Sequence, residues 1–123
     1  MIRFILKGET PAKKNSKIWT RSGKLIPSKR YQDWHMTAGA QIVAQMLQQK
    51  TEPIETPVSI KLNFQHGDLR RRDSDNGTSS VLDLLVDAGI LSDDNWQIVS
   101  KLQITNTYEK GNPMCTIEIE KLN

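Results

Sequence analysis

The sequence predicts an α+β domain in which two helices accompany a single mixed or antiparallel sheet, with elements in the order β-α-β-α-β-β. Three observations lead to this prediction. Apolar and polar residues alternate from Val58 to Gln65, which is typical of a half-buried strand. Apolar residues recur at helical spacing between residues 31 and 46. Short apolar stretches at residues 2–7, 99–108 and 115–119 supply the other strands.

The first half of the chain contains one strand, one small hairpin and one long helix. Residues 2–7 form the strand, and residues 19–25 form the hairpin, which turns at Ser22-Gly23. The helix runs from Ser28, a plausible N-cap, to about Gln49. Its apolar stripe consists of Tyr31, Trp34, Ala38, Ile42 and Met46.

The second half contains the second helix and the last two strands. We expect Asp75 at the N-cap or in the first turn of this helix, which ends near Ala88 because Gly89 is a good stop residue. In the strand over residues 99–108, Leu102 and Ile104 should point inward. The final two strands are expected to pair as an antiparallel hairpin around the turn Gly111-Asn112-Pro113.

Length and composition predict one soluble domain over residues 1–123, with 37% apolar and 25% charged residues. No apolar run approaches the ~20 residues that a membrane-spanning helix needs. Cys115 is the only cysteine, which excludes an intrachain disulfide and a cysteine-based zinc site. We therefore expect a cytoplasmic protein without a membrane partner.

The net charge of +3 hides a strong asymmetry along the chain. Residues 1–30 contain nine of the 17 Lys and Arg but only one of the 14 acids, so this segment carries +8 and the remainder −5. A basic arm beside an acidic body suits a nucleic-acid enzyme. A solvated lysine-rich loop is the alternative interpretation of the charge run alone.

Three aspartates are the candidate catalytic residues. Asp73 and Asp75 follow the run Arg70–Arg72 at the mouth of the second predicted helix, and Asp94 lies in the turn after that helix. Carboxylates suit Mg²⁺, which prefers oxygen ligands, and neighbouring arginines suit phosphate. This combination indicates phosphodiester cleavage. Structural roles also fit the pattern, with Asp75 as a helix cap and Asp94 as a turn residue.

Two blocks of sequence make the resemblance specific. The first is Arg70-Arg71-Arg72-Asp73-x-Asp75-Asn76, and the second is Ala88-Gly89-Ile90-Leu91-x-Asp93-Asp94-x-x-Gln97-Ile98-Val99. Their order and spacing resemble the RusA family of Holliday junction resolvases, and the loop at residues 11–16 resembles the family's loop after strand one. The resemblance spans essentially the full chain and implies a RusA-like fold.

The resemblance implies a Mg²⁺-dependent endonuclease, active as a homodimer, that cuts four-way DNA junctions by paired symmetric nicks in recombination and repair; we expect Mn²⁺ to substitute for Mg²⁺. The family's catalytic, metal-binding aspartates fall on Asp73, Asp75 and Asp94, and we expect Asp93 and Asp83 to support them. One position departs from the pattern. The family's prototype carries a lysine where this chain has Ser79. Three alternatives stay open: Lys101 or an arginine of the run compensates, turnover is slower, or the biological substrate differs.

The DNA contacts are expected from the arginine run and from the basic arm. The candidate residues are Arg70, Arg71, Arg72, Lys13, Lys14, Asn15, Lys17, Arg21 and Lys24. In this arm Trp19 is placed to stack on a base, whereas Trp96 is expected to pack in the core or at its rim. His66 could contact phosphate or carry a proton. Two other functions remain open: a non-catalytic nucleic-acid-binding module, and a metal-dependent phosphatase or nucleotide hydrolase.

Overall fold

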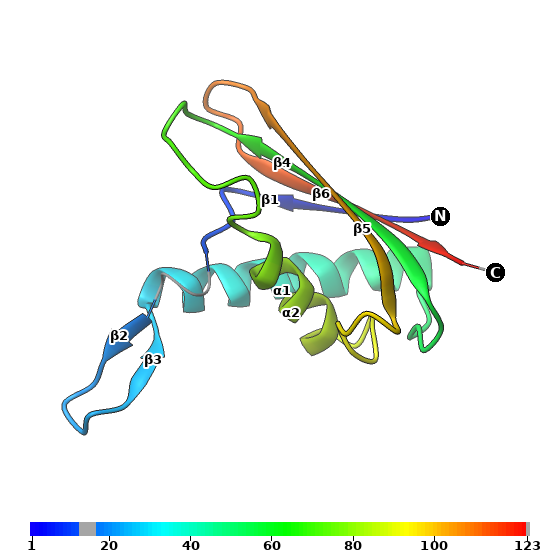
Figure 1. The fold of residues 1–123 in the computed structure, drawn as a ribbon, viewed down its shortest axis with the longest axis horizontal. Helices are drawn as coiled ribbons and strands as arrows, with labels where there is room; N and C mark the ends of the chain where they lie inside the picture. The colour runs from blue at the N-terminus through cyan, green and yellow to red at the C-terminus, as the bar shows by residue number, and fades with distance from the viewer. Residues whose placement is uncertain (13–16, 123) are drawn as a thin grey trace.

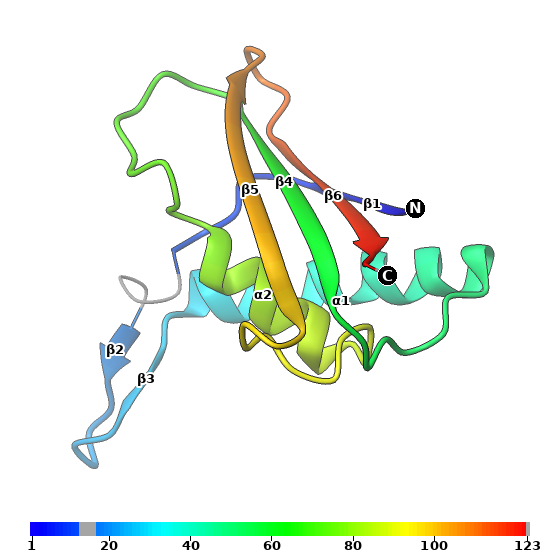
Figure 2. The ribbon, with the colours of Figure 1, turned by 45° about the vertical axis from the view of Figure 1, so that its right-hand side comes forward.

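A four-stranded sheet carries both long helices on one face, and a separate two-stranded hairpin projects from one end of the molecule (Figures 1 and 2). The structure is a computed structural model that describes residues 1–12 and 17–122. Its elements are β1 Ile2–Lys7, β2 Lys17–Trp19, β3 Leu25–Pro27, α1 Lys29–Gln49, β4 Val58–His66, α2 Thr78–Asp87, β5 Val99–Tyr108 and β6 Met114–Lys121. The predicted α+β class with a mixed sheet is confirmed. Across these described ranges, no helix combines the length and the apolar character that crossing a membrane requires.

The sheet has the strand order β1-β6-β4-β5. Strand β6 is antiparallel to both β1 and β4, whereas β4 and β5 run parallel. The predicted hairpin of the last two strands is therefore wrong, because β4 lies between β5 and β6. Strand β4 takes a central position since Val58, Ile60, Leu62 and Phe64 are all buried along it, whereas β5 lies at the edge and is mostly exposed.

The core fills the space between the sheet and the two helices. Its largest fully buried side chains are Phe4, Leu6, Ile42, Ile54, Ile60, Leu62, Leu84, Leu85, Ile90, Leu91, Ile117 and Ile119. Cys115 packs among them, and burial raises the pKa of its thiol to about 12. It is therefore protonated and packs as a small apolar residue.

Glutamines of α1 cover the free edge of β1. Gln41 accepts a hydrogen bond from the backbone N–H of Lys7 at 2.9 Å, and Gln45 both accepts from and donates to the backbone of Ile5 at 2.8 Å. These contacts satisfy backbone groups that an edge strand otherwise leaves unpaired. The four-residue spacing places the two side chains one above the other on the helix.

Most helix ends agree with the sequence. Ser28 is the N-cap of α1 and accepts from the N–H of Tyr31 at 3.2 Å. Helix α2, however, begins at Thr78 with Gly77 at the N-cap position, so the prediction that Asp75 caps it is wrong. Gly89 follows the end of α2 with a φ of +80°, as expected for a stop residue.

Two apolar side chains are more exposed than expected. Leu102 lies beside the buried Ile60 on the inward face, as predicted, but it is 40% exposed because β5 is an edge strand, whereas Ile104 is partly buried. Trp96 is 78% exposed, in a turn that projects beyond the core, so its predicted packing is wrong.

Candidate active site

The loop between β4 and α2 carries the arginine run and the first two candidate aspartates. Asp73 and Asp75 are exposed, and each backbone carbonyl accepts a turn hydrogen bond, from Asn76 N at 3.1 Å and from Thr78 N at 3.0 Å respectively. Among the described residues, neither side chain forms a hydrogen bond or ion pair. Both carboxylates are therefore exposed and without a partner in the part of the chain that the structure describes.

The three arginines divide into outward and inward groups. Arg72 is only 14% exposed, and its Nη2 contacts Glu9 Oε1 and Asp68 Oδ1, each at 2.7 Å. Arg70 is 78% exposed and contacts Asp68 Oδ2 at 3.3 Å, and Arg71 is also exposed. The guanidinium of Arg72 is thus largely buried within the chain, while those of Arg70 and Arg71 face solvent, where a DNA phosphate could reach them.

A basic concavity lies beside the loop. It has a volume of about 220 Å³, and its lining includes Arg30 of α1 together with Arg70 and Arg71. Several guanidinium groups around one concave surface favour phosphate binding, because each offers paired N–H donors and a fixed positive charge. Sequence reasoning did not name Arg30 among the DNA-binding candidates. It lies about 40 residues before the loop in the sequence, and the folded chain brings the two together.

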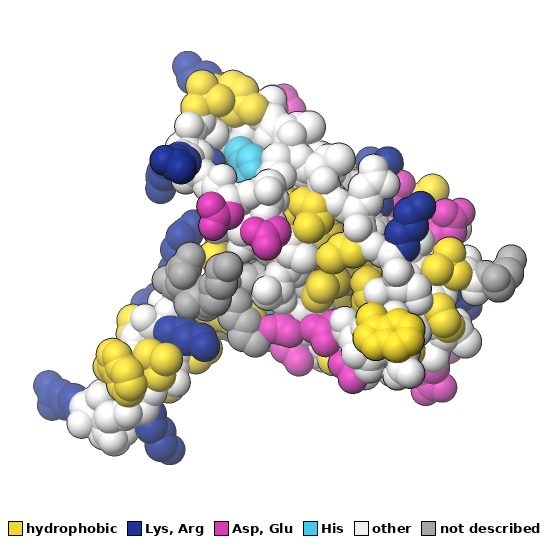
Figure 3. Space-filling model, in the orientation of Figure 1, with side chains coloured by type: hydrophobic (Ala, Val, Ile, Leu, Met, Phe, Trp, Pro, Cys, Tyr) yellow, Lys and Arg dark blue, Asp and Glu magenta, His cyan; other side chains and the backbone are white. Residues whose placement is uncertain are grey.

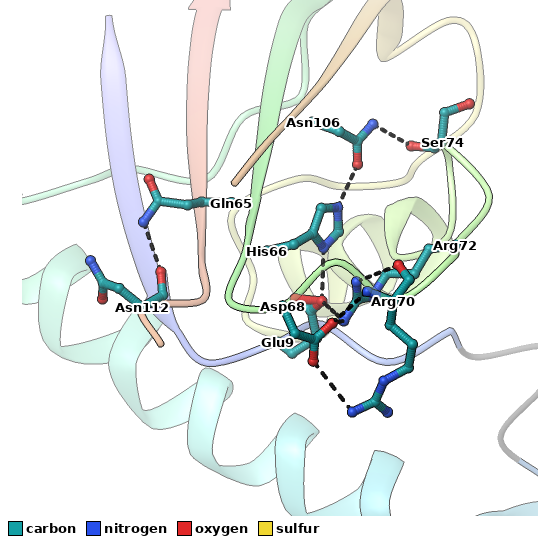
Figure 4. A network of polar contacts seen from close by, with 9 residues as sticks. All are labelled: Glu9, Gln65, His66, Asp68, Arg70, Arg72, Ser74, Asn106 and Asn112. Carbon is teal, nitrogen blue, oxygen red and sulfur yellow. Dashed lines mark hydrogen bonds and ion pairs between the residues drawn. The ribbon is translucent and has the colours of Figure 1, made fainter. Parts of the chain in front are cut away.

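A polar network anchors the aspartate loop to the sheet (Figure 4). His66 Nδ1 lies 2.7 Å from Glu9 Oε1, and His66 Nε2 lies 2.8 Å from Asn106 Oδ1. Asn106 Nδ2 then donates to the backbone carbonyl of Ser74 at 2.9 Å. Sequence reasoning missed Glu9 and Asn106; the one available signal was that Glu9 is the only acid in residues 1–30. It also assigned His66 to phosphate or proton transfer, whereas in the structure both its ring nitrogens have protein partners.

The third candidate aspartate lies in an acidic turn beyond α2. Asp93 Oδ1 accepts from the backbone N–H of Asp94 at 2.7 Å, and this bond, with the side chain of Asn95, lowers the pKa of Asp93. The pKa of Asp94 is raised, first by partial loss of hydration, then by a hydrogen bond with Asp93 and by the negative charges of Asp83 and Asp93. Both expected supporting residues therefore act electrostatically on Asp94.

Within residues 1–12 and 17–122, no group of three or more His, Cys, Asp or Glu side chains is arranged to hold one metal ion. Asp73 and Asp75 precede the start of α2, and Asp94 follows its end. A ten-residue helix is about 15 Å long. On the face shown in Figure 3, acidic side chains accordingly form separate groups rather than one cluster. The structure brings Asp73 close to Asp75 in the loop but does not assemble all three aspartates in one chain.

The donor chemistry nevertheless fits a hard divalent cation. Asp73, Asp75 and Asp94 offer only carboxylate oxygens, the ligand type that Mg²⁺ prefers. At Asp94 the neighbouring charges are negative, and a bound cation would offset them. Ser79 is exposed and brings no positive charge. Lys101 does not replace one, because it lines a separate groove with Lys61 and Glu118.

The β2–β3 hairpin, over residues 17–27, carries part of the basic segment 1–30. Lys17, Arg21 and Lys24 are exposed on it, and Trp19 is 72% exposed. The hairpin projects away from the sheet and helices (Figures 1 and 2). The predicted DNA contacts of Lys13, Lys14 and Asn15 lie outside the described residues.

Comparison with known families gives one match. A family model described as endodeoxyribonuclease RusA matches residues 8–120, which is nearly the whole chain. Among curated proteins, no match to this sequence was found. The matched range includes β4, the aspartate loop, α2 and the acidic turn.

Proposed function

The chain belongs to the endodeoxyribonuclease RusA family, and on that premise we propose that it is a Mg²⁺-dependent enzyme that resolves four-way DNA junctions by paired symmetric nicks. The family acts on Holliday junctions, and its members are endonucleases of DNA recombination. Metal dependence, a role in repair, a homodimeric state and a cytoplasmic location are parts of the proposal.

One observation carries the proposal. Asp73 and Asp75 lie on one exposed loop beside the concavity that Arg70 and Arg71 line, and their carboxylates have no partner within residues 1–12 and 17–122. Arg70 contacts Asp68 at 3.3 Å but its side chain is 78% exposed, and Arg71 is exposed. Solvent-facing arginines suit phosphate and exposed carboxylates suit a cation, the combination that phosphodiester cleavage requires.

The residues have distinct parts in the proposed reaction. Asp73, Asp75 and Asp94 would hold Mg²⁺, and Mn²⁺ would substitute. The chemistry supplied by the bound ion is activation of water and neutralisation of charge on the phosphoryl oxygens. Arg70 and Arg71 would bind the phosphates that flank the cleaved bond and hold the strand in line for attack.

A two-fold dimer follows from the substrate. Two symmetric cuts need two active sites related by the two-fold symmetry of the junction. The proposal also requires a third ligand to join the loop, because the described residues of one chain do not bring Asp94 together with Asp73 and Asp75.

Cleavage assays separate the proposal from its alternatives. A four-way junction, a matching linear duplex and a nucleotide are each incubated with Mg²⁺ and with EDTA. The proposal expects Mg²⁺-dependent cleavage of the junction. Salt-sensitive binding without cleavage would instead indicate a non-catalytic binding module, and hydrolysis of the nucleotide would indicate a phosphatase.

Two variants then test the loop. Asp73→Asn keeps the size of the side chain but removes its charge, so junction cleavage should fall by at least about 100-fold while binding in EDTA is retained. Glu52→Gln is the matched control, since Glu52 is an exposed acid on the connector after α1. Undiminished cleavage by Asp73→Asn at saturating Mg²⁺ would remove Asp73 from the catalytic set.

A further inference from the structure

The backbone between the two loop aspartates is held by a side chain of a distant strand. Ser74 lies between Asp73 and Asp75, and its carbonyl accepts the 2.9 Å hydrogen bond from Asn106 Nδ2. Asn106 belongs to β5 and pairs in register with Phe64 of β4. The side chain thus crosses from the edge strand to the loop (Figure 4).

We propose that Asn106 is a positioning residue that sets the geometry of the Asp73–Asp75 pair. What the pair does rests on the proposed function; that Asn106 fixes the loop rests on the contacts alone. Asn106 does not touch the reacting groups in this account. It acts through the backbone of Ser74.

Hydrogen-bond directions fix the orientation of the Asn106 amide. A carbonyl only accepts, so the amide nitrogen must face Ser74 and the amide oxygen must face His66. His66 Nε2 therefore donates. An ionised Glu9 also only accepts, so His66 Nδ1 donates as well. Each ring nitrogen of His66 therefore has an oxygen acceptor within hydrogen-bonding distance.

A second tie holds the loop just before the aspartates. Arg72 Nη1 donates to the carbonyl of Arg70 at 2.9 Å, while its Nη2 contacts Glu9 and Asp68. Glu9 Oε1 therefore receives both His66 and Arg72, each at 2.7 Å. Glu9 and Asp68 are thus interleaved with His66 and Arg72, and together these four side chains fix the loop at Arg70 and, through Asn106, at Ser74, on either side of Asp73.

The aspartates depend on these ties because their own side chains have no partner among the described residues. Among the described residues, the loop also contains a hydrogen bond from Arg70 N to Asp68 Oδ1 and the turn bonds from Asn76 N and Thr78 N. Groups that orient metal ligands in this way matter strongly, and their loss typically costs 10- to 100-fold in metal affinity or activity.

Asn106→Asp is the sharpest test. The substitution preserves the size of the side chain and its acceptor toward His66, but it replaces the donor with an acceptor that faces the Ser74 carbonyl. Asn106 is exposed on an edge strand, so the change leaves no cavity. Asn63→Asp is the matched control: Asn63 Oδ1 accepts from Thr105 Oγ1 at 2.9 Å across the same two strands, and its side chain forms no hydrogen bond with the loop among the described residues.

Two measurements read the effect. Amide hydrogen exchange at Asn76 and Thr78, in protein without metal, should become about tenfold faster or more in Asn106→Asp and stay within about twofold in Asn63→Asp. In the junction-cleavage assay, Asn106→Asp should lower the single-turnover rate or raise the half-saturating Mg²⁺ concentration by about 10- to 100-fold. Junction binding in EDTA should be retained.

The proposal is overturned if Asn106→Asp matches Asn63→Asp in both measurements. If Asn106→Asp does not fold, Asn106→Ala, which removes the tie without adding charge, is measured in the same way and decides the matter. If the wild-type protein cleaves no junction, the proposed function fails, yet the exchange measurement still decides whether Asn106 holds the loop.

Discussion

Gly77 occupies a position where no larger residue fits, and replacing it tests how tightly the aspartate loop joins the core. A Cβ added at Gly77 would lie 2.7 Å from Thr10 Cγ2 and 2.9 Å from Phe64 Cε1. Thr10 and Phe64 are buried, at 6% and 4% exposure, so neither can move into solvent. Forcing a methyl group into such packing costs about 1–3 kcal/mol.

We therefore expect Gly77→Ala to lower the free energy of unfolding by about 1–3 kcal/mol and the Tm by roughly 4–12 °C. Because Gly77 follows Asn76 directly, displaced packing should also slow junction cleavage. Urea denaturation and thermal unfolding, each followed by circular dichroism, measure the stability.

Gly39→Ala is the control for this prediction. Gly39 lies inside α1, and its added Cβ would meet only Leu84 Cδ1 at an ordinary 3.8 Å. Alanine is a better helix former than glycine by about 1 kcal/mol, so this variant should be as stable as the wild type or more stable. The reasoning is refuted if Gly77→Ala unfolds at the same urea concentration as the wild type, or if both substitutions destabilise equally.

Two further predictions concern DNA contact and pH. Trp19→Ala should weaken junction binding by about 1–3 kcal/mol, roughly 5- to 150-fold in Kd, because it removes a stacking surface on the basic hairpin. Binding is measured by gel-shift titration. Trp96→Ala is the control: it replaces a similarly exposed tryptophan and should bind the junction normally. The raised pKa of Asp94 means that the ionised carboxylate destabilises the metal-free fold. Asp94→Asn should therefore be more stable than the wild type at pH 7, and the difference in stability should disappear as the pH falls below 3.8, the ordinary pKa of an aspartate. A difference in urea midpoints that stays constant from pH 3 to pH 7 would contradict this prediction.

Local patterns predicted the elements of the fold well. The alternation along β4 specified a strand with one buried face, and Ser28 and Gly89 marked helix ends through backbone geometry that each residue favours. Strand pairing, in contrast, depends on contacts between distant segments and could not be predicted from local patterns. The short turn at Gly111-Asn112-Pro113 suggested that β5 and β6 pair, since strands adjacent in sequence usually do. Burial decides which strand is central: every second side chain of β4 is buried from Val58 to Phe64, whereas Val99 is the one buried side chain of β5, as expected for an edge strand.

The sequence shows the local part of the candidate site for the same reason. Carboxylates and arginines in one loop are visible in the sequence, and the catalytic assignment of that loop stays a prediction. The engagement of Arg72 with Glu9 was not visible, because the two residues are 63 positions apart and a run of arginines gives no sign of which member turns inward.

The error in the sheet and the omission at the site have one cause. If β5 paired with β6, as the turn suggested, Asn106 would have no strand neighbour near the loop. In the parallel pair of β4 and β5, Asn106 lies opposite Phe64 and within reach of both His66 and Ser74. The edge strand that contributes least to the core therefore supplies the side chain that holds the aspartate loop. A mutation on β5 can consequently impair cleavage while leaving the free energy of unfolding almost unchanged, and the comparison of Asn106→Asp with Asn63→Asp measures that separation directly.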